Sequence, residues 1–216
     1  VLTLSLRSFM AKKFLLGLAI FVFWTNLFAG EFLIDTSVVY VPAPYSQVHP
    51  SVAFDGTNYL MVWADDRDMN NKIYGARIDQ AGVILDPAGI VVSVAEGYCP
   101  SVAFDGTNYL VVWDDYRYQG WPNIFGARVT PAGVVLDIAG IAISTAANGQ
   151  SFSSVAFDGI NYFIVWHDNR NNVNEDDIYG ARVSKAGMVL DPSGIPISTA
   201  PDDQYFPSVA FDGTNY

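Results

Sequence analysis

The sequence has few of the residues on which several common kinds of site depend. Among 216 residues there is one cysteine, Cys99, and there are 11 basic against 22 acidic residues, a formal net charge of −11. A lone cysteine cannot form an internal disulfide, so core packing has to hold the fold. Nucleic-acid binding needs a clustered positive surface. We therefore expect no nucleic-acid partner.

Common catalytic and metal-binding motifs are also missing from the sequence. The two histidines, His49 and His167, are far apart and do not supply the spaced ligands typical of a zinc site. No Gly-x-Ser-x-Gly, Walker-type, Cys-x-x-Cys or His-Glu-x-x-His string occurs. The sequence therefore predicts no catalytic residue.

The most apolar stretch lies near the N-terminus and is short. It runs from Phe14 to Trp24, follows Met10-Ala11-Lys12-Lys13 and precedes a small residue, Ala29. A spanning helix needs about 20 apolar residues, whereas this layout is typical of a secretory signal peptide. We expect residues 1–29 to be a signal peptide, with the start at Met10 and cleavage after Ala29. An uncleaved anchor stays open, because Leu27 is large for its position.

Cleavage of such a signal would place the protein outside the cytoplasm. We expect a secreted, extracellular or cell-surface protein, with the periplasm as another location, and no membrane contact after cleavage.

The rest of the chain consists of tandem repeats. The decapeptide Pro50 to Tyr59 recurs unchanged at Pro100 to Tyr109 and at Pro207 to Tyr216, and with two changes at residues 153–162. Repeats of this length are typical of stacked structural units. Two further motifs, Trp-x-Asp-x-Arg and aromatic-Gly-Ala-Arg, follow in each unit, and then Gly-x-x-Leu-Asp. Their repeated residues are Trp63, Asp65, Arg67, Arg77, Trp113, Asp115, Arg117, Arg128, Trp166, Asp168, Arg170 and Arg182.

Each complete unit reads as four short strands. In the first unit these are residues 51–55, 59–63, 73–78 and 84–92, which are rich in Val, Ile, Tyr and Trp and are separated by turn residues. The second of these, residues 59–63, is apolar at every position, which indicates a sheet covered on both faces. One sheet of this size cannot cover both of its own faces, so the units must stack.

We therefore predict an all-β fold of tandem four-stranded antiparallel blades of β-propeller type. Three repeats are complete, which as written gives an open or truncated arc. The expected segments are a lead-in at 30–49 that resembles a final strand, blades at 50–99, 100–152 and 153–206, and the first strand of a truncated fourth blade at 207–216.

These motifs resemble a known type of repeat. The strings Ser-Val-Ala-Phe-Asp-Gly-Thr-Asn-Tyr, Trp-Asp-Asp-Tyr-Arg, Phe-Gly-Ala-Arg and Gly-Val-Val-Leu-Asp resemble the repeats of about fifty residues in large secreted bacterial β-propeller-like proteins. The resemblance covers residues 33–216. It implies a propeller-like module without an assigned reaction. Asp-boxes of the sialidase type and the paired motifs of WD40 blades are absent.

Residues present in every unit are better explained as scaffold than as chemistry, because one active site needs one constellation. We expect Asp65 to form a buried ion pair with Arg67 or Arg77. Functional candidates are residues that differ between units, which include His49, Glu96, Tyr98 and His167.

The loops between the second and third strands carry the other candidates. Tyr118 and Trp121 are predicted to bind a ligand by stacking on a sugar ring or a peptide, although packing against a neighbouring blade explains them equally well. Asn171 and Asn174 are predicted ligand-binding residues of the third unit. Its acidic run, Glu175, Asp176 and Asp177, offers oxygen donors for Ca²⁺, although a solvated surface loop explains it too. We expect no other cofactor.

Two functions remain open on this sequence. The first is a noncatalytic binding or scaffold module whose polar loops bind an extracellular glycan or protein. The alternative is a fragment of an exported, glycan-active hydrolase or lyase with its catalytic residues outside this segment. The remaining blades of a longer chain are expected partners in either case.

Overall fold

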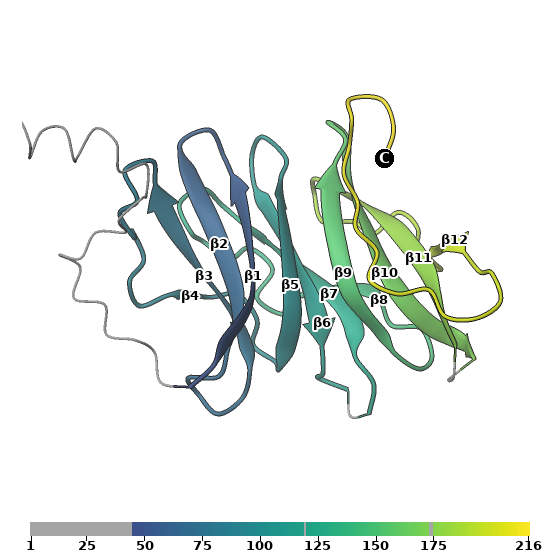
Figure 1. Cartoon of the computed structure of the whole chain (residues 1–216). Coiled ribbons are helices and arrows are strands. Elements are labelled where there is room, and N and C mark those ends of the chain that lie inside the picture. Colours follow the sequence, from purple (N-terminus) through teal and green to yellow (C-terminus); the bar gives the residue numbers. More distant parts are fainter. Residues whose placement is uncertain (1–44, 119, 173–174) are drawn as a thin grey trace, which may run out of the picture. The chain divides into compact units, whose positions relative to one another are not determined.

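The computed structural model describes residues 45–118, 120–172 and 175–216 (Figure 1). The expected signal peptide and all but the last residues of the lead-in, as well as Asn174, lie outside the described residues. The described chain forms three four-stranded antiparallel sheets, each made of four consecutive strands. The first holds β1 (Gln47–Phe54), β2 (Asn58–Asp65), β3 (Lys72–Asp79) and β4 (Ile90–Val91). The second holds β5 (Gly97–Phe104), β6 (Tyr109–Asp115), β7 (Asn123–Val129) and β8 (Ile141–Ser144). The third holds β9 (Gln150–Phe157), β10 (Asn161–Asn172), β11 (Glu175–Ser184) and β12 (Ile195–Ser198).

This arrangement confirms the predicted all-β fold of tandem four-stranded antiparallel blades. The sheets stack in chain order, and their first strands lie next to one another, with β1 against β5 and β5 against β9 (Figure 1). Within the described ranges, no helix is long and apolar enough to cross a membrane.

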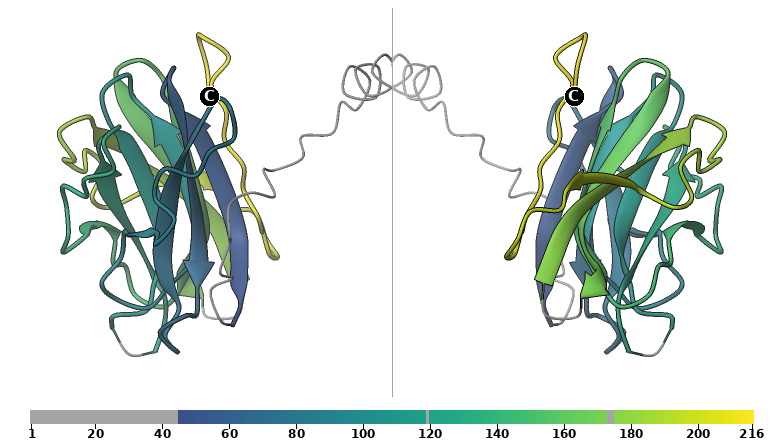
Figure 2. Two further views of the ribbon diagram at one scale, coloured as in Figure 1. Left: turned by 90° about the vertical axis from the view of Figure 1, so that its left-hand side faces the viewer. Right: turned by 90° about the vertical axis from the view of Figure 1, so that its right-hand side faces the viewer.

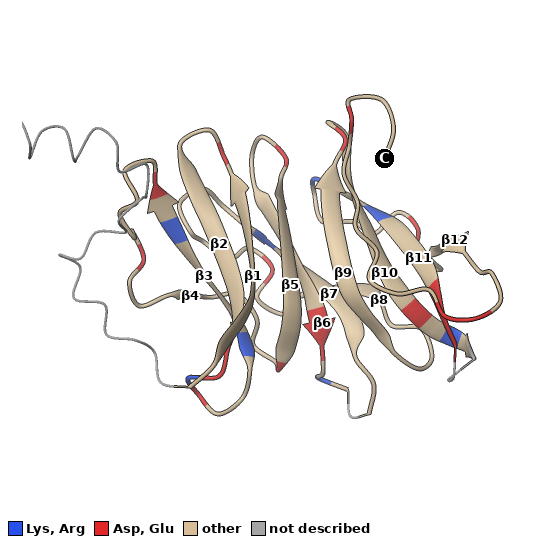
Figure 3. Ribbon diagram, viewed as in Figure 1, with Lys and Arg blue, Asp and Glu red and all other residues tan. Residues whose placement is uncertain are grey.

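The core lies between the sheets. The middle sheet is covered on both faces, and every residue of β6 is buried, as the apolar run of its first five residues predicts. One cluster joins the first two sheets and a second joins the last two. Their largest fully buried side chains include Leu60, Ile73, Tyr109, Trp113, Leu110, Ile124, Tyr162 and Trp166. Charged residues lie mostly at strand ends and in loops, which leaves the strand centres apolar (Figure 3).

The repeated Asp-Gly-Thr-Asn turn fixes the first hairpin of each sheet. In the first sheet, one carboxylate oxygen of Asp55 accepts hydrogen bonds from the backbone N–H groups of Thr57 and Asn58, both at 2.7 Å. Gly56 has a φ of +96°, which costs glycine little because it has no Cβ. The same contacts recur at Asp105, Asp158 and Asp212.

The expected fourth strand at residues 84–92 is wrong in its length. Ile84 makes an isolated bridge with Ile78, and only Ile90–Val91 form a strand. The backbone between them turns, because the Gly89 N–H donates to the Asp86 carbonyl at 2.9 Å. The Asp86 carboxylate accepts hydrogen bonds from the backbone N–H and the guanidinium of Arg77.

A β-bulge interrupts the first strand of every sheet. The register shifts between Val48 and Ser51 in β1 and between Tyr98 and Ser101 in β5, and a matching shift occurs where β9 pairs with β10. The bulged residues have positive φ values although none is glycine. These residues are His49, Cys99 and Phe152, with φ of +55°, +48° and +55°. Phe206 repeats the conformation at +53°.

Residues 207–216 form no strand but lie against the third sheet (Figure 2). The Tyr216 hydroxyl donates to the Asn161 carbonyl at 3.2 Å, and the Val209 N–H donates to the Ser154 hydroxyl at 3.2 Å. Matching bonds join the third sheet to the second, where the Tyr162 hydroxyl donates to Asn108 at 2.8 Å. From the second unit onward, the tyrosine of the repeated decapeptide therefore makes the same contact with the preceding sheet.

Candidate functional site

The Trp-x-Asp-x-Arg motif builds the same buried cluster in all three sheets. In the second sheet the Trp113 indole N–H donates to Asp115 at 2.9 Å, and the Arg117 guanidinium donates to the same carboxylate at 2.7 Å. Asp115 is fully buried, and the Arg117 guanidinium carbon lies 3.8 Å from the centre of the Phe125 ring. Equivalent contacts surround Asp65 and Asp168.

These clusters also hold the segment that precedes the fourth strand of each sheet. Each arginine also donates to a backbone carbonyl before the fourth strand, Arg67 to Ala88 at 2.8 Å and Arg117 to Ala139 at 2.6 Å. Burial opposes ionisation of Asp65, but hydrogen bonds from Arg67 and Trp63 outweigh burial and lower its pKa. The cluster therefore has internal partners for its charges and serves the scaffold.

The predicted ion pair of Asp65 forms with Arg67, at 2.6 Å, and not with Arg77. Arg77 instead binds Asp86 of the Gly-x-x-Leu-Asp motif in a two-pronged contact, with 2.8 and 2.9 Å between the nitrogen and oxygen atoms. The pairs Arg128–Asp137 and Arg182–Asp191 repeat this geometry at 2.8 Å. Sequence reasoning missed this partner, although the repeated Asp of the last motif was its signal.

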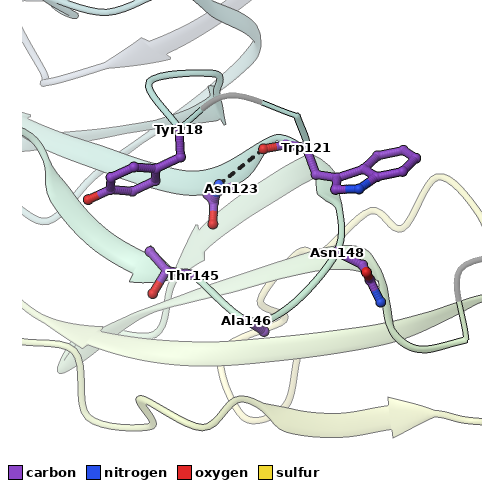
Figure 4. Close-up of a pocket in the computed structure, with 6 residues that line it drawn as sticks. All are labelled: Tyr118, Trp121, Asn123, Thr145, Ala146 and Asn148. Atoms are coloured by element: carbon purple, nitrogen blue, oxygen red, sulfur yellow. Dashed lines mark hydrogen bonds between the residues drawn. The ribbon is translucent and has the colours of Figure 1, made fainter.

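The loop between β6 and β7 forms a pocket with two of the predicted ligand-binding residues. A cavity of about 390 Å³ is lined by Tyr118, Trp121, Asn123, Thr145, Ala146 and Asn148. Figure 4 shows Tyr118 and Trp121 on opposite sides of this loop pocket, with Asn123 between them. Both aromatic side chains are more than half exposed, at 57% and 54%.

The loop pocket joins two segments of the second blade. Tyr118, Trp121 and Asn123 belong to the β6–β7 loop and the start of β7, and the remaining residues follow β8 (Figure 4). The Asn123 side-chain amide donates to the Trp121 carbonyl at 3.2 Å, which fixes one wall. One edge of the Trp121 indole also lies beside Gly149, 3.6 Å from the position that a Cβ atom on Gly149 would occupy. The Trp121 side chain therefore both packs on the scaffold and offers free ring surface.

Asn171, predicted to bind a ligand in the third blade, does not line this pocket. The Asn171 side-chain amide donates to the Asp177 carboxylate at 2.9 Å and to the Tyr179 hydroxyl at 3.0 Å. The loop amide of Asn171 thus holds its own hairpin together.

The acidic run predicted for Ca²⁺ is divided between different contacts. Asp177 binds Asn171, whereas the backbone N–H of Asp176 donates to the Asp203 carboxylate at 3.1 Å. Adjacent residues of a strand point to opposite faces, so Asp176 and Asp177 do not converge on one point. Among the described residues, no group of three or more His, Cys, Asp or Glu side chains is placed to hold a metal ion.

The other residues that differ between units lie on the first strands, just before them, or on the second strand that pairs with them. The Ser151 hydroxyl and His167 Nε2 are 2.5 Å apart, and the His167 ring lies 5.0 Å from the Phe152 ring between their centres. Burial lowers the pKa of His167. Tyr98 contacts Glu96 through its hydroxyl at 3.2 Å and accepts a bond from Asn71 of the first blade at 2.6 Å.

Sequence reasoning passed over one buried acid, Asp114. It occupies the position of Ala64 and His167 in the other units, so its divergence was a usable signal. Its side chain is 2% exposed, and Oδ2 accepts a hydrogen bond from the Phe152 N–H of the next sheet at 3.1 Å. Burial raises the pKa of Asp114 to about 7.

Comparison with known proteins supports the fold. No protein-family model matches the chain, and no curated protein sequence matches it significantly. Among solved structures, an α-L-arabinofuranosidase from Lactobacillus brevis is similar, with 13% identity and a TM-score of 0.50 over 80% of this chain and 66% of that one. A protein described as a glycoside hydrolase matches with 16% identity and a TM-score of 0.51, over 79% of this chain and 41% of that one.

A thermostable family-43 glycoside hydrolase matches at 16% identity and a TM-score of 0.49, over 73% of this chain and 54% of that one. The chain spans about half the length of other similar structures. At these identities the likeness to the two structures with TM-scores of 0.50 and 0.51 establishes the fold alone, which is of the β-propeller type.

Proposed function

We propose that this chain is part of an exported, noncatalytic β-propeller module that binds a glycan through the loop pocket of its second blade. The observation that carries the proposal is the pair of exposed rings, Tyr118 and Trp121, beside a cavity of about 390 Å³. Aromatic faces stack on sugar rings, and a small number of polar groups then fixes their orientation. Asn123, Thr145 and Asn148 supply such groups here.

The division of the repeats between scaffold and loop supports a binding role. The repeated Asp and Arg side chains have partners inside their own sheets. The spacing between the two repeated arginines, by contrast, grows from 10 to 11 to 12 residues along the chain, and the loop sequences differ. A rigid scaffold with variable loops is a common way to present a binding surface.

The glycan is proposed because of the names of similar structures. One is an α-L-arabinofuranosidase and another is described as a glycoside hydrolase. Their likeness to this chain is one of fold, so the choice of polysaccharide is for experiment.

Affinity electrophoresis in gels that contain arabinan, arabinoxylan or mannan tests the proposal. We expect one of these polymers to retard the wild-type chain and Trp121→Ala to lose the retardation, because truncation removes the larger ring of the pocket. Met69→Ala is a matched control, since Met69 is 77% exposed in the corresponding loop of the first blade. Equal retardation of Trp121→Ala and the wild type would disprove the loop pocket as the site.

The alternative function is a fragment of an exported hydrolase or lyase, which the names of the similar structures favour. Release of new reducing ends from the bound polymer by the purified chain would support the alternative and contradict a noncatalytic role. Export is tested separately: the N-terminal sequence of the protein recovered from the periplasm or the medium should begin at Gly30.

A further inference from the structure

The bulged residues of the first strands line a second depression. A cavity of about 270 Å³, the bulge groove, is lined by His49, Pro50, Cys99, Pro100, Phe152, Ser153, Phe206 and Pro207. All four residues that precede the repeated proline or serine have positive φ values between +48° and +55°. Because the same bulge recurs in adjacent blades, these side chains are brought into one row.

Two buried polar atoms beside the bulge groove have no hydrogen-bond partner among the described residues. They are Oδ1 of Asp114 and the hydroxyl of Ser153. Asp114 is 2% exposed, and it contacts two groove residues, Cys99 through its thiol and Phe152 through its N–H. An unpaired buried polar atom costs about 1–3 kcal/mol, so a native structure keeps one for a reason.

Asp114 also differs from the buried acids at the next position of the second strands. Asp65, Asp115 and Asp168 each form an ion pair with an arginine at 2.5–2.7 Å. Among the described residues, no Lys or Arg forms an ion pair with Asp114; the groups that surround it are the Cys99 thiol, the Tyr116 phenol and the backbone amides of Phe152 and Ser153. Its ionised form therefore lacks a counterion within the described chain.

The walls of the groove suit an organic cation. Phe152 and Phe206 form an edge-to-face pair with ring centres 4.8 Å apart, and the lining residues include no Lys or Arg. Aromatic faces attract ammonium groups by about 0.5–2 kcal/mol. The acidic chain, at −11, also concentrates cations near its surface.

We propose that the bulge groove binds a small organic ammonium ion, with the Asp114 carboxylate as counterion and the Phe152 and Phe206 rings against its carbon chain. The Ser153 hydroxyl accepts one of the ammonium hydrogens. This site is separate from the loop pocket and does not depend on the glycan proposal.

The proposal predicts coupling between binding and a proton. Burial raises the pKa of Asp114 to about 7, so below that pH the acid must lose its proton to pair with the ammonium ion. Burial also raises the pKa of Cys99 to about 12 and raises that of Tyr116, so both stay neutral between pH 6 and 8. His167, whose ring lies near the rings of both Phe152 and Phe206, has a lowered pKa because it is buried.

Calorimetric titration of the whole chain with n-propylammonium chloride tests the site, with 1-propanol as the uncharged probe of the same length. The apparent affinity should rise by about tenfold from pH 6 to pH 8, because the ionised fraction of a group with a pKa near 7 rises by that factor. In buffers of different ionisation enthalpy, binding at pH 6 should release close to one proton.

Variants separate the sources of these effects. Asp114→Asn should lose propylammonium binding, whereas Glu96→Gln removes the same charge at an exposed position and should bind like the wild type. Propylammonium binding to His49→Gln should still release the proton. That result would exclude His49 as the source of the proton. If Asp114→Asn does not fold, the proton count of the wild type at pH 6 and 8 decides alone.

The proposal is overturned by any of three results. These are no propylammonium binding up to tens of millimolar, equal affinity for 1-propanol, and binding to folded Asp114→Asn that matches the wild type. Loss of glycan retardation in Trp121→Ala with intact propylammonium binding would confirm that the two sites are independent.

Discussion

Two neighbouring carboxylates of β6 are equally buried but have different partners. Asp115 is fully buried and binds Arg117 and Trp113, whereas Asp114 is 2% exposed and accepts a hydrogen bond only from backbone N–H and thiol groups. A buried charge without a counterion disfavours its own ionisation. Asp115 is therefore a fixed part of the scaffold, and Asp114 is the residue whose state responds to pH.

The state of Asp114 predicts how stability changes with pH. Its folded pKa of about 7 exceeds the usual value of 3.8, so the folded state holds the proton more tightly and loses stability as pH rises between these values. From pH 5 to pH 8, the free energy of unfolding of the wild type should fall relative to Asp114→Asn by roughly 2–3 kcal/mol. Urea unfolding of both proteins at the two pH values measures the difference, from which the other carboxyls cancel. A constant difference would show that Asp114 ionises normally.

The sequence predicted the loop pocket better than it predicted the groove. Tyr118 and Trp121 could be selected from the sequence because large aromatic residues in a polar loop are conspicuous locally, and both line the cavity. Asp114 was missed because it follows a repeated tryptophan and precedes a repeated aspartate, so it reads as part of the motif. Its partners lie 15 and 38 residues away, and only the stacking of sheets brings Phe152 to it.

The glycine of the Gly-Ala-Arg motif shows how strands of one blade fit together. Gly75, Gly126 and Gly180 lie in the third strands with ordinary φ values, so they are not needed for a turn. A Cβ at these positions would lie 3.2, 3.0 and 2.8 Å from a backbone oxygen of the second strand. The motif therefore keeps a close approach of the two strands free of side chains.

Alanine substitutions at these glycines should destabilise the blades in a fixed order. Gly180→Ala should cost the most, about 1–3 kcal/mol, because its Cβ also meets Phe163 and Ile197 at 2.9 Å. Gly126→Ala should cost less, and Gly75→Ala the least. Thermal or urea unfolding measures the series. The reverse order would mean that strand propensity, rather than the close approach, determines the choice of glycine.

Element types were more predictable than their ends. Residues 58–65 form a strand as the run of apolar β-formers predicts, but the fourth strand at 84–92 shrinks to Ile90–Val91. The strand is short because of side-chain contacts made elsewhere in the sheet. Asp86 pairs with Arg77, and the chain turns at Gly89, where Arg67 donates to the Ala88 carbonyl. Apolar periodicity carries no information about these ion pairs.

At the scale of the whole molecule, identical sequences have different surroundings. Pro50 to Tyr59 and Pro100 to Tyr109 are the same decapeptide, yet Tyr59 is 40% exposed and Tyr109 is fully buried. Likewise Val52 is 53% exposed, against 7% for Val102. The sequence predicts that units stack, but it does not show which face of which unit is covered, because that depends on position in the stack.

This difference leads to a prediction about stacking energy. Tyr59 and Tyr109 make the same contact within their hairpins, with ring centres 4.7 Å from Phe54 and 4.9 Å from Phe104. Only Tyr109 also packs on the preceding sheet and donates to the Asn58 carbonyl, at 3.1 Å. Tyr109→Ala should therefore cost about 3–5 kcal/mol, the range for a buried aromatic residue, against about 1 kcal/mol for Tyr59→Ala.

Urea unfolding of the two tyrosine variants isolates the contribution of the interface between sheets, because the hairpin sequence around the substituted residue is identical. The two-state fit should apply to both, and the difference in unfolding free energy should be at least about 2 kcal/mol. Equal costs would mean that the outer face of the first sheet is covered in solution as well as the inner one. A smaller slope with urea for Tyr109→Ala alone would instead indicate that the first sheet unfolds separately, since neighbouring units in a stack are held together only by their shared interface.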